Sequence, residues 1–62
     1  MPEVYIYAYE GRSIEQKRKL VKAMTDAVTE SLGVKPEAVT VQIIEGKREN
    51  RAVAGVLMTD VK

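Results

Sequence analysis

The sequence predicts an α/β (α+β) fold: a single βαβ protomer with parallel strands, followed by a short C-terminal strand or hairpin. Three observations support it: alternating apolar residues at 3–9, an uninterrupted amphipathic stretch at 14–32, and a segment rich in branched residues at 39–45. A strand, a helix and a second strand in this order form a parallel pair joined by a right-handed crossover. With 62 residues, we expect one domain covering residues 1–62.

The first expected strand, residues 3–9, alternates between aliphatic side chains and tyrosines. A period of two places each kind on its own face. The two sets are Val4, Ile6 and Ala8 on one face and Tyr5, Tyr7 and Tyr9 on the other. Because neither face is charged, we expect the chain's own helix to cover the aliphatic face and a second subunit to cover the tyrosines.

The expected helix has clear start and stop signals. Ser13 precedes Gln16 by three residues, which is the spacing of a capping box. Gly33 and then Pro36 end the helix after residue 32. Apolar residues fall at helical spacing and predict one packed stripe, composed of Leu20, Val21, Met24, Ala27 or Val28, and Leu32.

The remainder of the chain predicts a second strand and a small apolar tail. Residues 39–45 have strand composition, 46–50 form a polar turn, and 52–58 are apolar but interrupted by Gly55. The tail is too short for a buried helix, so we expect a short strand or hairpin. A two-stranded sheet leaves exposed edges, and we therefore expect the protomer to assemble into an oligomer.

Size and composition support assembly and exclude several functions. A chain this short buries only about 60% of its unfolded surface. It has no Cys and no His, so disulfides are impossible and a zinc site is not expected, yet 45% of the residues are apolar. A net charge of +1 with mixed signs argues against a nucleic-acid surface. With no apolar run of membrane length and no signal-peptide pattern, we expect a cytoplasmic protein without a membrane partner.

Few residues offer chemistry, because the usual nucleophile–base pairs and phosphate-binding loops are missing. Pro2 follows Met1, and removal of Met1 would leave a terminal secondary amine. A terminal amine has a pKa of about 7.7–8.0, which burial and nearby cations lower towards neutrality. While Met1 remains attached, the Pro2 nitrogen is an amide and is not a base. Arg12, in the expected strand-to-helix loop, is the candidate to bind a carboxylate through two hydrogen bonds.

Other charged residues are expected to be solvated. The carboxylates nearest the expected strand ends and turns are Glu10, Glu45 and Glu49, and we interpret them as loop acids. The basic cluster on the helix is interpreted as its solvent face, because Glu15 and Asp26 flank it. That cluster consists of Lys17, Arg18, Lys19 and Lys22.

The chain resembles the 4-oxalocrotonate tautomerase family of the tautomerase superfamily. The resemblance rests on Pro2 behind Met1, a short strand, and then the motifs 10–13 and 15–17, Glu-Gly-Arg-Ser and Glu-Gln-Lys. It implies a βαβ protomer with a short C-terminal hairpin that assembles as a homo-hexamer with a dimer as building block. It also implies enol–keto or double-bond isomerisation of a small unsaturated or 2-oxo carboxylate, with no metal or cofactor.

The resemblance also implies roles for four residues. Pro2 matches the catalytic terminal proline, and Arg12 matches the arginine that binds a substrate carboxylate, often in a neighbouring subunit's site. Thr40 stands where the best-known members have a second arginine that polarises the 2-oxo group. Arg51 stands where the family usually has an aromatic wall of the site. These departures predict lower efficiency with a dicarboxylate. Either Arg51 replaces the missing guanidinium, or it faces solvent and the site is weakened.

Two alternative functions remain open. In a hydratase or dehalogenase of the same superfamily, a protonated terminal proline acts as the acid and a carboxylate activates water, a role that Glu49 or Glu10 would have to fill. In a non-catalytic reading, the chain is a subunit of a mixed oligomer, which Thr40 and Arg51 favour. The sequence leaves open the physiological substrate, the pathway, the oligomer and the removal of Met1.

Overall fold

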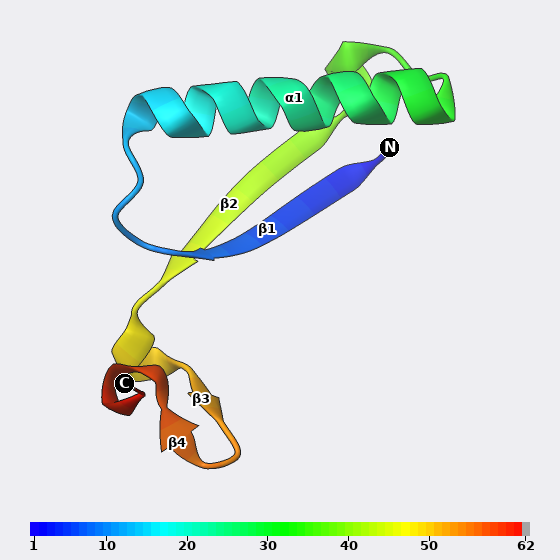
Figure 1. The fold of residues 1–62 in the computed structure, drawn as a ribbon. Coiled ribbons are helices and arrows are strands. Elements are labelled where there is room, and N and C mark those ends of the chain that lie inside the picture. The colour runs from blue at the N-terminus through cyan, green and yellow to red at the C-terminus, as the bar shows by residue number, and fades with distance from the viewer. Residues whose placement is uncertain (62) are drawn as a thin grey trace.

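The computed structural model describes residues 1–61 and contains a βαβ unit followed by a C-terminal hairpin (Figure 1). The βαβ unit comprises β1 (Glu3–Tyr9), α1 (Ile14–Leu32) and β2 (Thr40–Gly46). The hairpin comprises β3 (Ala52–Val53) and β4 (Val56–Leu57). Short 3₁₀ helices occupy the connections and the end: η1 (Pro36–Ala38), η2 (Arg48–Asn50) and η3 (Met58–Asp60).

The two long strands are parallel, as the sequence predicts. Their register pairs Glu3 with Thr40 at one end and Tyr9 with Gly46 at the other. β1 has the predicted bounds, whereas β2 begins and ends one residue later than predicted. The shift has a local cause, because the backbone N–H of Val39 donates to the carbonyl of Pro36 over 3.1 Å and so belongs to the end of η1.

The predicted helix signals are confirmed at both ends of α1. The Ser13 hydroxyl accepts a hydrogen bond from the Gln16 backbone N–H over 3.2 Å, and the Gln16 side chain accepts one from the Ser13 N–H over 2.8 Å. This reciprocal pair satisfies two otherwise free N–H groups of the first turn. Gly33 ends the helix in the left-handed conformation at φ 69°, with its N–H bonded to Thr29.

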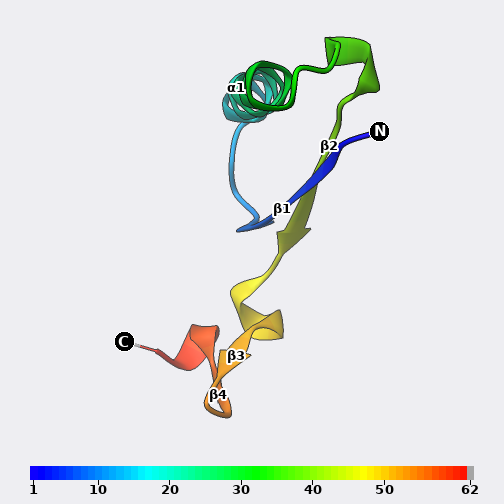
Figure 2. The same cartoon turned by 90° about the vertical axis from the view of Figure 1, so that its right-hand side faces the viewer.

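The helix covers one face of the sheet, as the end-on view shows (Figure 2). The alternation in β1 is confirmed, since its aliphatic residues are half-buried while Tyr5 and Tyr7 are 51% and 77% exposed. The half-buried side of α1 differs in part from the predicted stripe. Leu20 and Leu32 are exposed, and the half-buried positions are Lys17, Val21, Met24, Thr25, Val28 and Thr29.

The protomer is extended and has no buried core. No residue in the described range is buried, and the accessible surface is 5125 Å². A compact monomer of this mass would expose roughly 4,000 Å². The radius of gyration is 14.9 Å, against roughly 10–11 Å for a compact domain of this length. An isolated protomer therefore leaves much of its apolar surface in water.

The hairpin projects away from the sheet, beyond the end of β2 (Figures 1 and 2). Its turn residues Ala54 and Gly55 both have positive φ, 54° and 80°. Two positive φ values are characteristic of the type I′ turn, whose twist suits a two-residue hairpin. Few contacts bind this segment to the βαβ unit, so its apolar residues Val53, Val56 and Leu57 remain exposed.

Candidate functional site

Two of the predicted site residues meet at one end of the sheet. The Thr40 backbone N–H donates a hydrogen bond to the Pro2 carbonyl over 3.1 Å, which extends the β1–β2 ladder by one step. Pro2 is half-buried and Thr40 is exposed. Met1 precedes Pro2 in the structure, so the Pro2 nitrogen is an amide there.

Arg12 lies at the other end of the same strand. The chain leaves β1 through a loop in which the Glu10 N–H donates to the Gly46 carbonyl over 2.9 Å. Gly11 adopts φ 112°, a conformation that residues with a side chain rarely adopt. The exposed Arg12 side chain then borders a cavity of about 140 Å³ between α1 and the sheet. The cavity is also lined by Ala8, Tyr9, Gln16, Lys17, Leu20, Ile43 and Glu45.

Pro2 and Arg12 of one protomer are therefore far apart. The whole of β1 separates them, and seven residues of a strand span roughly 20 Å. A small carboxylate substrate cannot touch both. A site that uses both residues has to combine residues from at least two protomers.

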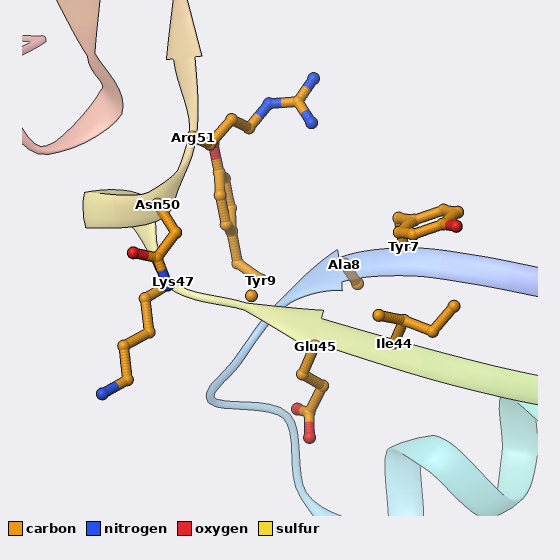
Figure 3. Close-up of a pocket in the computed structure, with 9 residues that line it drawn as sticks. Tyr7, Ala8, Tyr9, Ile44, Glu45, Lys47, Asn50 and Arg51 are labelled. Atoms are coloured by element: carbon orange, nitrogen blue, oxygen red, sulfur yellow. The ribbon is translucent and has the colours of Figure 1, made fainter.

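Arg51 lies in a third place, beyond the C-terminal end of β2. It borders an open depression of about 470 Å³ on the tyrosine side of the sheet (Figure 3). The depression is lined by Tyr7, Ala8, Tyr9, Ile44, Glu45, Gly46, Lys47, Asn50 and Arg51. The Arg48 guanidinium stacks on the Tyr9 ring, 4.7 Å from its centroid. This cation–π contact secures η2 against the end of β1.

One ion pair joins elements that are distant in sequence. The Lys17 ammonium lies 2.8 Å from a Glu45 carboxylate oxygen, and the two side chains are 28% and 33% exposed. Figure 3 shows the Glu45 side chain leaving β2 on the side opposite Tyr7 and Arg51. Glu45 is exposed, as predicted, but it lies within β2 and not in a loop, and Lys17 is half-buried and not fully solvated. The sequence does contain a signal for this contact. Lys17 is in helical register with Val21 and Met24, which places it on the side of the helix that faces the sheet.

The carboxylates considered for water activation lie away from Pro2 in the protomer. Glu10 follows the C-terminal end of β1, and Glu49 lies in η2 with its carboxylate 3.9 Å from Lys47. The carboxylate next to Pro2 in the chain is Glu3, which accepts a hydrogen bond from the Tyr5 hydroxyl over 2.6 Å. This hydrogen bond, together with the Glu3 charge, raises the pKa of Tyr5 above its ordinary value of 10.0.

Within residues 1–61, the acidic side chains do not gather in the groups of three or more that a metal ion would require. None of the helices in this range combines the length and the apolar composition needed to cross a bilayer.

Comparison with known proteins identifies the family. The sequence model described as tautomerase enzyme matches residues 2–61, which is nearly the whole chain.

The chain belongs to the tautomerase family.

Relatives within the tautomerase family are similar along their full length. The 2-hydroxymuconate tautomerase of Bacillus subtilis (strain 168) is 42% identical over 62 residues, covering all of both chains. A crystal structure of a homologue of 4-oxalocrotonate tautomerase is 41% identical, with a TM-score of 0.93 over 98% of this chain and all of the other. A heterohexameric 4-oxalocrotonate tautomerase from Chloroflexus aurantiacus is 31% identical, with a TM-score of 0.90 over all of both chains. The resemblance and the predicted fold class are thereby confirmed.

Proposed function

We propose that this chain is a tautomerase that moves protons within small 2-hydroxydienoate or 2-oxo acids, with Pro2 as the base after Met1 is removed. The observation that carries the proposal is the setting of Pro2. It immediately precedes β1, is half-buried, and is anchored through its carbonyl to Thr40. Once Met1 is removed, this setting suits a terminal amine that takes part in the reaction.

The reaction needs one base and no net change in composition. The neutral Pro2 amine removes the proton of the 2-hydroxyl group, the C2–O bond becomes a carbonyl, and the conjugated double bond shifts along the chain. The protonated amine then returns the same proton to a carbon of the substrate. Nearby cations and apolar walls favour the neutral amine, the form that accepts a proton at neutral pH.

Arg12 is proposed to bind the substrate carboxylate in the site of a neighbouring protomer. Within one protomer the length of β1 separates it from Pro2, so it serves another subunit's Pro2. No carboxylate of residues 1–61 lies within ion-pair distance of Arg12, and its side chain is exposed. A free, planar guanidinium can hold a carboxylate through two parallel hydrogen bonds and stabilise the developing dienolate.

Thr40 and Arg51 are proposed to set the substrate range. Thr40 lies beside Pro2 and offers a hydroxyl where a guanidinium would polarise the 2-oxo group. Arg51 is exposed, carries no ion pair within the described residues, and supplies a cation at the rim of the tyrosine-lined depression. We propose that it takes over part of the missing charge in an assembled site.

The proposed site requires an assembly, and we propose a homo-hexamer built from dimers in the cytoplasm. The absence of a buried core in residues 1–61 supports association, as does the exposed tyrosine face of the sheet. Sedimentation or light scattering should give about six times the chain mass of 6.9 kDa. A monomer at micromolar concentration would exclude a site that combines two protomers.

The test is an ultraviolet tautomerase assay on protein whose mass shows that Met1 is absent. The substrates are a 2-hydroxydienoate such as 2-hydroxymuconate and, as an aryl alternative, phenylenolpyruvate. Loss of the proline should lower kcat/KM by about 10²-fold or more. Pro2→Ala keeps a primary amine, so residual activity is expected. Equal activity of Pro2→Ala and the unaltered protein, or no activity of the Met-free protein on either substrate, would contradict the proposal.

A second function has one specific observation in its favour. A 31% identical relative is described as a heterohexamer, and this chain carries Thr40 and Arg51 at the two positions that depart from the family pattern. A non-catalytic subunit of a mixed oligomer would be inactive alone and would gain activity on addition of a second tautomerase chain. No specific observation favours the water-adding alternative: Glu10 lies at the Arg12 end of β1, and the Glu49 carboxylate lies 3.9 Å from the Lys47 ammonium.

A further inference from the structure

We propose that Lys17 and Glu45 are a positioning pair that holds Arg12 ready for the substrate and prevents Glu45 from competing for its guanidinium. This inference rests on the proposed function of Arg12. It gives Lys17 and Glu45 a role in substrate binding, although neither residue touches the substrate.

The Lys17–Glu45 pair closes the Arg12 loop mechanically. The loop that carries Arg12 is held on one side by the Glu10 N–H to Gly46 carbonyl bond. On the other side it is held by Ser13, which caps α1 and whose carbonyl accepts from the Lys17 N–H over 3.1 Å. The Lys17 side chain then reaches Glu45, 28 residues away, over 2.8 Å. The start of α1 and the end of β2 are thereby joined directly across the loop.

The same pair also acts electrostatically on Arg12. Arg12, Lys17 and Glu45 line the same cavity of about 140 Å³. Glu45 is a carboxylate, the group that Arg12 is proposed to bind in a substrate. The Lys17 ammonium is paired with the Glu45 carboxylate, and Arg12 has no ion pair among residues 1–61. Removal of the Lys17 charge frees an internal carboxylate within the cavity that Arg12 lines.

The helix provides a matched control pair. Lys22 and Asp26 form an ion pair of 2.6 Å, one turn along the same helix. Both side chains are more exposed, at 76% and 60%, and the pair joins no second element. Loss of Lys22 therefore removes a cation and an ion pair without releasing the Arg12 loop.

The experiment compares steady-state constants of Met-free variants on 2-hydroxymuconate. Lys17→Met should raise KM by roughly tenfold and also lower kcat, because Arg12 is proposed both to orient the substrate carboxylate and to stabilise the developing dienolate. Glu45→Gln should raise KM less, since it loosens the loop without adding a competing charge. The double exchange Lys17→Glu with Glu45→Lys should restore KM, and Lys22→Met should stay within about twofold of the unaltered protein.

A second readout does not depend on activity. The ¹⁵N relaxation of the Arg12 Nε–H group should show greater motion, or a shifted resonance from a new ion pair, in Lys17→Met and a return to the original signal in the double exchange. If Arg12→Ala raises KM but the Lys17 and Glu45 variants change neither KM nor this signal, the positioning inference is wrong. If Arg12→Ala leaves KM unchanged, the proposed role of Arg12 fails instead, and the relaxation data still decide whether the pair positions the loop.

Discussion

The Thr40 backbone N–H donates to the Pro2 carbonyl over 3.1 Å, so the start of the chain is fixed to the sheet without using the Pro2 nitrogen. A proline has no N–H to contribute to a ladder, and it is tolerated here because it stands just before the first strand residue. The same bond places Thr40 at the Pro2 end of the sheet. Removal of Met1 would convert the Pro2 amide nitrogen into a terminal amine at that end, while the Pro2 carbonyl stays bonded to Thr40.

The separation of Pro2 and Arg12 within a protomer predicts complementation between two impaired variants. Pro2→Ala and Arg12→Ala subunits, unfolded together and refolded as a mixture, should form some sites that contain both native residues. The mixture should be more active in the ultraviolet assay than either variant refolded alone at the same total concentration. A mixture no more active than the average of its two parents would show that each site belongs to a single chain.

Arg51→Ala tests whether this arginine replaces the missing guanidinium. If Arg51 contacts the substrate, loss of a charged hydrogen bond of about 1.5–3 kcal/mol should lower kcat/KM by roughly 10- to 150-fold. Lys35→Ala is the control, since Lys35 is an exposed cation at the start of η1. An unchanged kcat/KM for Arg51→Ala on every active substrate would show that Arg51 faces solvent and does not contact the substrate.

Thr40→Arg should improve use of a dicarboxylate. A guanidinium introduced beside Pro2 supplies the positive charge that polarises a 2-oxo group, so kcat/KM for 2-hydroxymuconate should rise by about tenfold or more. Thr40→Gln is the matched comparison, because it adds length and hydrogen bonding without charge. If both substitutions have the same effect, charge at this position does not limit the reaction.

Tyr5 should ionise at higher pH than an ordinary tyrosine, because its hydroxyl donates to Glu3 and the Glu3 charge disfavours the phenolate. A raised pKa in the folded state stabilises the fold at pH values below the unfolded pKa. That contribution is lost as the pH rises through the folded pKa. In a titration followed by phenolate absorbance, Glu3→Gln should shift one tyrosine transition to lower pH. An unchanged titration curve would show that the hydrogen bond is absent in solution.

Ser13→Ala should destabilise the protein by about 1 kcal/mol, because the first turn of α1 loses the side-chain acceptor for the Gln16 N–H. Unfolding by urea measures this change, at one fixed protein concentration because association contributes to stability. Ser31→Ala, a substitution at an exposed position in the last turn, is the control. Equal midpoints for the two variants would exclude a stabilising cap at Ser13.

The local elements were predictable because their signals lie close together in the sequence. The period-two pattern of residues 3–9, the Ser13–Gln16 capping box and the glycine at 33 each act within a few residues, and the structure has all of them. The parallel pairing also followed, since a helix between two strands leaves little alternative. The one-residue shift of β2 was not predicted, because it depends on the 3₁₀ turn that Pro36 begins.

The arrangement of the site was less predictable, because it depends on contacts between distant residues. The Lys17–Glu45 pair spans 28 residues, and the composition of either segment alone favours solvation. Exposure of Leu20 likewise depends on which side of α1 rests on the sheet. The separation of Pro2 and Arg12 was predictable, because β1 has the bounds that its alternating pattern predicts.

Titration of the Pro2 nitrogen by ¹⁵N NMR, on Met-free protein labelled at proline, is the most direct measurement of the central claim. We predict that this amine titrates at or below the ordinary range of a terminal amine and that Arg12→Ala raises its pKa, because a neighbouring cation has been removed. A Pro2 amine that titrates above that range and does not respond to Arg12→Ala would contradict a catalytic base held beside a guanidinium.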